Sequence, residues 1–411
     1  MLMRLGGCSG DVEKTVKLHI LFIPSWYPSH VNDISGSFFR EQAQMLAAGG
    51  CEVGVIVPQL TSIRAPLGGA LRSGVQFEMD GRVATWRGRI PNLAPRLLRA
   101  QARIAAWLTR HLYGAYVAAH GRPDILHVHS ALLAGIGAVD LSETEGIPLV
   151  LSEHSSGYAR GRVNRAGVEL ARRVATRASA RFAVSAPFSA MMSQTLGSEV
   201  GRWEIMPNAV DATFLQGPLP SKQDGVFRFL HISLLDENKN VAGLLSSFAR
   251  QFRGQLGIRL RIGGDGPDRN VLTVEAEALG IAPQVDFLGR LSREQVRSEL
   301  GSCDAFVLSS RFETFGVVLI EALAMGRPVI ATSCGGPEDI VTPETGLLVP
   351  VDDEAALGEA MVRMTGERGR YIPQDLRRHC SDHFGPQAMT SRWLEVYRDI
   401  VEAQVKQVAD V

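Results

Sequence analysis

The sequence lacks paired cysteines and long apolar runs. Its five cysteines are scattered along 411 residues, with no C-x-x-C pair; they are Cys8, Cys51, Cys303, Cys334 and Cys380. An odd, dispersed set argues against a disulfide framework and indicates reduced, buried thiols in a cytoplasmic protein. No apolar run approaches the roughly 18 residues that a transmembrane helix needs, so we expect no membrane span.

The sequence also lacks net charge, because 43 basic residues balance 43 acidic ones. The balance hides an asymmetry: residues 1–210 contain 22 Lys and Arg against 15 Asp and Glu, whereas residues 211–411 contain 21 against 28. A chain of this length is too long for one typical core, so two domains are expected. A basic half and an acidic half predict that the two domains face different partners.

Two stretches of the basic half are rich in arginine. Residues 82–110 hold seven arginines and no acid, and residues 160–181 hold seven arginines with Glu169 as their acid. Either stretch alone is typical of a solvated helix face. Together, with Trp107 nearby, they indicate attraction to an anionic membrane surface or a phosphate-bearing acceptor. Nucleic acid is not an expected partner, because no aromatic-interleaved basic signature is present.

Apolar runs alternate with helical segments in both halves. In the first half, a strand at 18–23 leads into a long loop, a helix at 38–48 and a strand at 53–57, which is how a Rossmann-like sheet begins. No G-x-G-x-x-G is present, so a dinucleotide site is not expected here. Gly36, just before the helix, would still let a ligand approach the backbone closely.

The domain boundaries follow from Pro- and Gly-bearing segments at 207–211 and 217–225. We predict a flexible tail at 1–16, an N-terminal Rossmann-like domain at 17–210, a second such domain at 211–386 and a C-terminal helix at 387–411. Trp393 and Tyr397 lie at helical spacing in that helix, which is expected to pack back on the first domain.

Histidines follow two apolar strands of the first half. His127 and His129 end one strand, and Glu153-His154 follow the next. Ligands bind at the carboxyl ends of strands in open α/β sheets, which makes His154 a candidate. A lone histidine is more often a packed, hydrogen-bonded residue, and His129 is expected to be one.

The most informative stretch is residues 304–336. An apolar strand at 305–308 is followed by a polar loop, a helix from about Gly316 to Met325 and a second strand at 328–331. Gly326 is placed to end the helix, so the segment predicts a right-handed strand–helix–strand unit. Backbone N–H groups of residues 315–317 would lie at the helix N-terminus, which is a ready anion site.

Two carboxylates, Glu313 and Glu321, bracket the start of this helix. Either acid alone could be an ordinary solvated residue near a helix dipole. Glu321, however, stands among apolar residues, where a carboxylate is costly to bury unless it is hydrogen-bonded. Sugar hydroxyls would satisfy it, so the stretch predicts a site for a phosphorylated, hydroxyl-rich ligand.

These segments resemble the group 1 family (GT4) of retaining nucleotide-sugar glycosyltransferases, which have a GT-B fold. The segment from Glu313 to Glu321 is similar to the E-x7-E motif of that family, and four further segments match in order, at 207–211, 263–267, 335–338 and 346–350. The resemblance implies an α/β fold with two Rossmann-like domains facing each other across a cleft. The N-terminal domain would bind the acceptor and the C-terminal domain the donor.

The resemblance also implies roles for the matched residues. Glu313 would accept hydrogen bonds from the donor sugar, Glu321 would bind the ribose, and Lys239 would neutralise the departing diphosphate. His154 matches the histidine near the reacting sugar, and Gly36 would let the N-terminal domain approach the donor. The predicted catalytic residues are thus Glu313, His154 and Lys239, and the predicted donor-binding residues are Gly36, Arg290, Leu291, Phe315, Gly316, Val317 and Glu321.

One position departs from the family pattern. Many members have an arginine five residues before the lysine, where this chain has Leu234. Leucine cannot bind a diphosphate as a guanidinium does, so Lys239 and the helix N-terminus would suffice or Arg290 would substitute. Leu291-Ser292-Arg293 lack the acid that guanine-preferring members carry there, which favours uracil.

No D-x-D occurs, so neither a metal nor another cofactor is expected. The resemblance implies a hexosyltransferase that retains the anomeric configuration and stabilises the leaving group electrostatically. The interpretation is transfer from a UDP-sugar to a saccharide acceptor, lipid-linked at the cytoplasmic face of a membrane, in cell-surface polysaccharide or glycolipid biosynthesis. Two alternatives stay open: a nucleotide-sugar 2-epimerase of the same fold, and a non-catalytic sugar-nucleotide-binding subunit.

Overall fold

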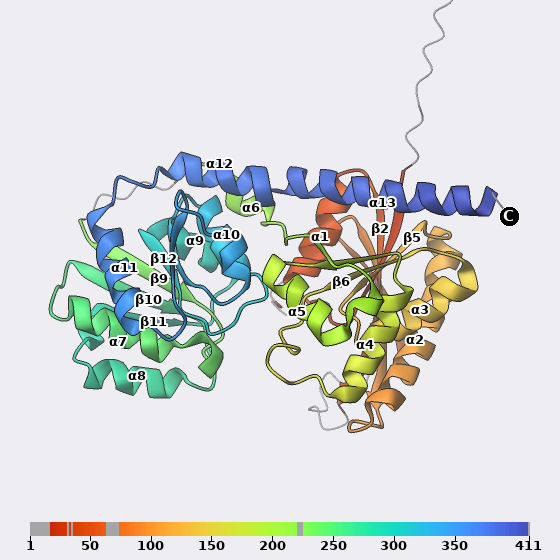
Figure 1. Cartoon of the computed structure of the whole chain (residues 1–411), viewed down its shortest axis with the longest axis horizontal. Helices are drawn as coiled ribbons and strands as arrows, with labels where there is room; N and C mark the ends of the chain where they lie inside the picture. The colour runs from red at the N-terminus through yellow and green to blue at the C-terminus, as the bar shows by residue number, and fades with distance from the viewer. Residues whose placement is uncertain (1–16, 31–32, 34–35, 63–73, 220–224, 410–411) are drawn as a thin grey trace, which may run out of the picture.

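The protein consists of two α/β domains that lie side by side and are bridged along one edge by the last two helices (Figure 1). The computed structural model describes residues 17–30, 33, 36–62, 74–219 and 225–409. The predicted tail at 1–16 lies outside the described residues. Two Rossmann-like domains were predicted, and this prediction is confirmed.

The N-terminal sheet has eight strands in the order β3-β4-β2-β1-β5-β6-β7-β8. They are β1 (His19–Pro24), β2 (Glu52–Ser62), β3 (Gly74–Asp80), β4 (Val83–Asn92), β5 (Ile125–His129), β6 (Leu149–Glu153), β7 (Ala180–Ala183) and β8 (Glu204–Ile205). Neighbouring strands are parallel except at the β3–β4 hairpin. The accompanying helices are α1 (Ser37–Ala48), α2 (Leu98–His120), α3 (Ala134–Glu145), α4 (Arg165–Arg177) and α5 (Ala186–Leu196).

The β3–β4 hairpin corrects the prediction for the first arginine stretch. Arg87 and Arg89 lie on β4, and helix α2 begins only at Leu98. Arg87 is buried: its Nε donates to Glu78 Oε1 at 2.8 Å and its Nη2 to the Pro28 carbonyl at 2.6 Å. The arginines of this stretch therefore do not form one solvated helix face, because the Arg87 guanidinium is buried and binds the Pro28 carbonyl.

The C-terminal sheet has six parallel strands in the order β11-β10-β9-β12-β13-β14. They are β9 (Phe227–Ile232), β10 (Ile258–Gly263), β11 (Val285–Gly289), β12 (Ala305–Leu308), β13 (Val329–Thr332) and β14 (Gly346–Val349). The strand order reverses between β9 and β12, and the loops after these two strands begin at Ser233 and Ser309. Such a topological switch point is where open α/β sheets bind ligands.

The helices of this domain follow the strands. They are α7 (Val241–Phe252), α8 (Arg269–Ala278), α9 (Arg293–Ser302), α10 (Val317–Ala324) and α11 (Glu354–Gly366), and the short helix α6 (Ala212–Leu215) lies in the connection between the domains. Within the described part of the chain, no helix combines the length and the apolar character needed to cross a bilayer.

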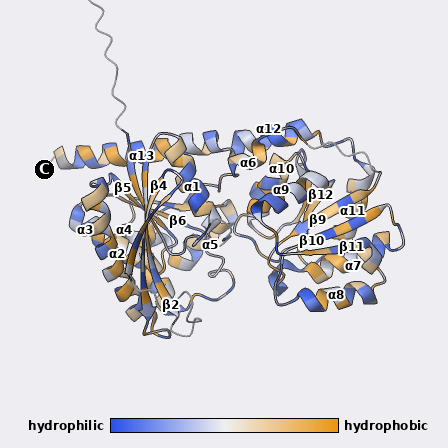
Figure 2. Cartoon of the chain, turned by 180° about the vertical axis from the view of Figure 1, so that it is seen from behind, coloured by the Kyte–Doolittle hydropathy of each residue, from blue (hydrophilic) through white to orange (hydrophobic). Residues whose placement is uncertain are grey.

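The last two helices run from one domain to the other. Helix α12 (Pro373–Phe384) packs on α10, and α13 (Pro386–Ala409) crosses to the N-terminal domain (Figure 1). Hydrophobic and hydrophilic residues are interspersed along α13 (Figure 2), and Trp393 lies 5.0 Å from the Phe182 ring. The chain thus crosses between domains twice, and the Val210 N–H donates to the Phe384 carbonyl at 2.8 Å where the crossings meet.

Candidate active site

The carboxyl ends of the two sheets face each other, and polar contacts join the domains there. Arg160 pairs with Asp236 at 3.0 Å, and Ser185 Oγ donates to the Thr314 carbonyl at 2.7 Å. A cavity of about 540 Å³ lies between the domains, with residues of α1 on one wall and of α6 and α9 on the other. The predicted cleft is therefore present: α1, α6 and α9 line the cavity, and the loops after β6, β9 and β12 take part in contacts between the domains.

A lysine–glutamate pair occupies the switch point. Lys239 ends a 3₁₀ turn after β9, and its Nζ lies 2.6 Å from Glu313 Oε1. Ser310 Oγ donates to the same oxygen at 2.7 Å. The Glu313 backbone is fixed as well, because its N–H donates to the Cys334 carbonyl and its own carbonyl accepts from the Gly336 N–H. The Lys239 ammonium is partly exposed, so it can meet an anion without leaving its partner.

Helix α10 begins beside this pair. Its N-cap, Gly316, has φ 98°, a conformation that favours glycine, and Phe315 is buried against Phe384. A Cβ on Gly336 would lie 2.2 Å from Phe315 Cα, so the loops after β12 and β13 interlock at a glycine. Because first-turn N–H groups of a helix have no intrahelical acceptor, the backbone at 315–317 is a candidate anion site next to Lys239.

Glu321 is buried on the second turn of α10, and its partner is an arginine. Arg293 Nη1 donates to Glu321 Oε1 at 2.5 Å. Burial raises the pKa of Glu321, and the guanidinium opposes that shift. The argument that this carboxylate needs sugar hydroxyls to offset its burial is therefore wrong, since Arg293 already does so. Arg293 is also a site residue that the sequence prediction missed.

A glycine loop shapes the floor of the switch point. Cβ atoms on Gly264 and Gly266 would lie 1.8 Å and 2.2 Å from the carbonyl oxygens of Ser233 and Leu235. The loops after β9 and β10 can therefore touch only through glycine. Leu234, five residues before Lys239, is 60% exposed, so this apolar side chain is not buried.

The two remaining predicted donor residues lie at the end of β11. Arg290 is exposed, and Leu291 is half-buried over Gly263. The structure thus groups Lys239, Glu313 and residues 315–317 at the switch point. It does not bring Arg290 into the Lys239–Glu313 pair.

His154 and Gly36 are neighbours on the N-terminal side. Gly36 caps α1 with φ 76°, and a Cβ there would lie 2.7 Å from Trp26 Cδ1. The His154 ring lies 5.2 Å and 4.9 Å from the rings of Phe38 and Phe39, which follow Gly36. Burial lowers the pKa of His154 to about 3, so its imidazole is neutral at physiological pH.

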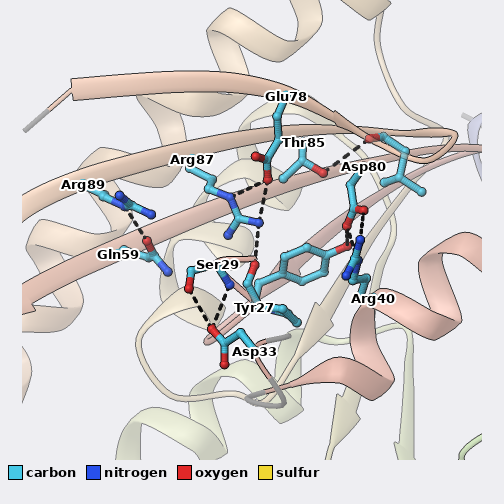
Figure 3. Close-up of polar contacts among 12 residues, drawn as sticks. Tyr27, Ser29, Asp33, Arg40, Gln59, Glu78, Asp80, Thr85, Arg87 and Arg89 are labelled. Carbon is cyan, nitrogen blue, oxygen red and sulfur yellow. Dashed lines mark hydrogen bonds and ion pairs between the residues drawn. The ribbon is translucent and has the colours of Figure 1, made fainter. Parts of the chain in front are cut away.

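Tyr27 and Pro28, which follow β1, are held by a polar network on the β3–β4 hairpin (Figure 3). Asp80 accepts hydrogen bonds from Arg40 and, at 3.5 Å, from the Tyr27 hydroxyl. Arg87 reaches the Pro28 carbonyl from the same hairpin. The hairpin therefore fixes the entry to α1 and, with it, the position of Gly36.

Two histidines extend inward from His154. His129 Nδ1 lies 3.4 Å from His154 Nε2, and the His129 and His127 rings stack 4.1 Å apart. His127 Nδ1 is 2.7 Å from the hydroxyl of Tyr397 on α13. His129 is a packed residue, as expected, but it packs directly against the candidate catalytic histidine. The C-terminal helix thus reaches the site through two rings.

The fold and this site define a two-domain sugar-transferase architecture, and comparison with known proteins agrees. Residues 35–214 match the family described as Glycosyltransferase Family 4, and residues 220–380 match Glycosyl transferases group 1. The chain belongs to the group 1 glycosyltransferases of family GT4, as the sequence motifs indicated.

Proteins with similar sequences include several that are named as sugar transferases. Glycogen synthase of Mycobacterium tuberculosis (strain CDC 1551 / Oshkosh) is 26% identical over 58% of this chain, and the match spans 59% of that protein. The GDP-mannose-dependent alpha-mannosyltransferase of the same strain is 31% identical over 61% of this chain and 66% of its own length. A putative teichuronic acid biosynthesis glycosyltransferase of Bacillus subtilis (strain 168) is 25% identical over 85% of this chain and 90% of its own.

Solved structures share the fold. Sucrose-phosphate synthase from Thermosynechococcus elongatus superposes with a TM-score of 0.75 at 21% identity, covering 94% of this chain and 100% of that one. Anabaena HepE in complex with UDP-glucose superposes with a TM-score of 0.68 at 17% identity, covering 92% and 99%. The predicted GT-B fold is confirmed.

Proposed function

We propose that the protein is a hexosyltransferase that moves a sugar from a nucleoside-diphosphate donor, preferably a UDP-sugar, to a saccharide acceptor. The observation that carries the proposal is the Lys239–Glu313 pair beside the first turn of α10. The ammonium and the helix N–H groups would hold the diphosphate, and Glu313 would accept hydrogen bonds from sugar hydroxyls. Glu321 would take the ribose, and His154 and Gly36 would meet the donor from the other domain.

The proposed reaction retains the anomeric configuration and needs no metal. As the sugar–phosphate bond breaks, negative charge develops on the leaving diphosphate, where Lys239 and the α10 amides stabilise it. The departing phosphate oxygen takes the proton of the acceptor hydroxyl, which attacks from the same face. Because burial keeps the His154 imidazole neutral, we propose that it hydrogen-bonds to the sugar and carries no positive charge in the reaction.

An activity screen tests the proposal. The protein is incubated with UDP-, GDP- and ADP-sugars, each alone and with a panel of saccharide acceptors, in buffer with EDTA. We expect transfer from a UDP-sugar, with EDTA causing no loss and NMR showing the donor's anomeric configuration in the product. Conversion of the donor sugar without acceptor would favour the 2-epimerase instead. Nucleotide binding without turnover on any acceptor would favour a non-catalytic subunit.

We further propose that the acceptor is lipid-linked and that the N-terminal domain meets an anionic membrane at the cytoplasmic face. The support is a surface at the start of α2, where Leu93 and Leu97 are 79% and 64% exposed beside the exposed Arg96. Several arginines counted in the sequence are neutralised, however. Arg99 pairs with Glu169 at 2.6 Å. Asp140 lies 3.7 Å from Arg110 and 3.4 Å from Arg173.

Charge reversal of this surface tests the membrane contact. Arg96→Glu combined with Arg103→Glu is expected to lower flotation with vesicles containing anionic lipid by at least about fivefold, since each basic residue near such a surface contributes roughly 1 kcal/mol. Arg250→Glu with Arg253→Glu, on the C-terminal domain, is the matched control and should float as the wild type does. Equal flotation of both variants, or none by the wild type, would contradict the membrane contact while leaving sugar transfer open.

A further inference from the structure

One guanidinium joins the ribose candidate Glu321 to the opposite domain. Arg293 opens α9, whose N-terminus is fixed by a capping box between Ser292 and Gln295. Its Nη1 donates to Glu321 Oε1 at 2.5 Å, and its Nη2 donates to Glu41 Oε1 on α1 at 2.9 Å. Its Cζ lies 4.9 Å from the centre of the Phe214 ring. The side chain is therefore held from three elements at the wall of the interdomain cavity.

This contact opposes the effect of burial on Glu321, which raises the pKa of the carboxyl group. The carboxylate is 4% exposed on an apolar helix, where an unpaired charge would be costly and the group would take up a proton instead. Arg293 engages Oε1 and favours the ionised form. An ionised carboxylate is a stronger acceptor for hydroxyl groups than a neutral one. Because Arg293 donates to Oε1, Oε2 is the oxygen that the proposal below assigns to the ribose.

The second contact makes the arrangement depend on the N-terminal domain. Glu41 lies on α1, the helix that begins at Gly36, and it is the interdomain partner of Arg293. Asp211, in the connection between the domains, lies 3.8 Å from the same Nη2. In this arrangement of the domains, Glu41 thus holds the guanidinium that contacts Glu321.

We propose that Arg293 is a positioning residue for donor binding: it holds Glu321 for the ribose hydroxyls, and through Glu41 it couples ribose binding to domain closure. The inference rests on the proposed function, because it takes Glu321 as the ribose acceptor. Coupling of this kind is reciprocal, so a nucleotide that engages Glu321 favours the closed arrangement and closure favours the nucleotide. Lysine could not replace Arg293, since a point charge cannot contact two carboxylates in a fixed fork.

The first test compares UDP with 2′,3′-dideoxy-UDP by calorimetry, with the guanosine pair measured in parallel. Wild type should prefer the nucleotide with ribose hydroxyls by about tenfold or more, as expected for hydrogen bonds to a charged group. Arg293→Met should bind that nucleotide about tenfold more weakly and lose most of the preference. A general loss of structure would instead weaken both nucleotides equally.

The control is Arg297→Met, one turn further along α9 at the same cavity, where Arg297 donates to the Gln216 carbonyl. It should keep the wild-type preference within about twofold. If Arg293→Met fails to fold, Arg293→Lys takes its place in the test. Its ratio of affinities for UDP and 2′,3′-dideoxy-UDP should be at least about threefold smaller than that of the wild type. An unchanged preference in the Arg293 variants would overturn the inference. A wild type that binds no nucleotide would instead contradict the proposed function.

The second test addresses closure. UDP is expected to reduce the radius of gyration of the wild type, measured by small-angle X-ray scattering, and to have at most a small effect on Glu41→Ala. Glu41→Ala should still bind UDP more tightly than 2′,3′-dideoxy-UDP when both are titrated to saturation, since Arg293 still reaches Glu321. Equal contraction of the variant and the wild type, or no contraction of the wild type, would overturn the coupling.

Discussion

Replacing Lys239 with methionine is expected to lower the turnover number of sugar transfer by about 10²–10³-fold, the usual effect of removing one preorganised charge-stabilising group. The Nζ of Lys239 lies 2.6 Å from Glu313 Oε1, next to the amides that begin α10. The variant removes a cation where the diphosphate charge would develop. It also leaves Glu313 without that partner, and an acid freed there would repel the leaving group.

Three measurements make this expectation specific. Turnover at saturating donor should fall much more than the affinity for UDP, because the charge on the leaving group develops in the transition state. Lys239→Arg should keep part of the activity, since it restores the charge in a different shape. Lys406→Met, near the end of α13, is the control and should match the wild type. A Lys239→Met turnover within threefold of the wild type would remove this lysine from the proposed mechanism.

Much of the fold follows from local sequence, because buried parallel strands are nearly continuous apolar runs. The strand at 305–308 and the helix after it were predicted within a residue or two of β12 and α10. The β3–β4 hairpin was missed because Arg87, Arg89 and their neighbours interrupt the apolar alternation of β4. Burial of Arg87 is tolerated there because Glu78 and the Pro28 carbonyl accept hydrogen bonds from its guanidinium. Glu78 lies on the other strand of the hairpin and Pro28 lies after β1, 59 residues before Arg87.

The site, like the fold, has residues that local sequence predicts and residues that only the folded chain brings together. Glu313 and Glu321 were found because their spacing across the start of one helix is local information. Arg293 was missed because it meets Glu321 across 28 residues and Glu41 across 252. One local signal was available: Ser292 and Gln295 form a capping box, which predicts that a helix begins at Arg293 and turns its side chain toward the helix start. It does not say which acid lies there.

The C-terminal helix carries the largest expected effect on stability. Trp393→Ala is expected to destabilise the N-terminal domain by about 3–5 kcal/mol, the usual cost of emptying a buried aromatic position. Trp393 is 3% exposed, and its ring lies 5.0 Å from Phe182 and 4.8 Å from His127. Val405→Ala, at a 62% exposed position of the same helix, should change stability by no more than about 0.5 kcal/mol.

The positions of the tryptophans make the measurement selective. All five lie in the N-terminal domain or on α13, at positions 26, 86, 107, 203 and 393, so tryptophan fluorescence during urea unfolding reports that domain. In Trp393→Ala, the fluorescence of the remaining four tryptophans should change at a lower urea concentration than in the wild type. The unfolding of the C-terminal domain, followed by far-UV circular dichroism, should keep its urea midpoint. If the fluorescence transition does not move, α13 is not part of the N-terminal core. Because Tyr397 of α13 contacts His127, a detached helix should also impair transfer, by loosening the histidine stack behind His154.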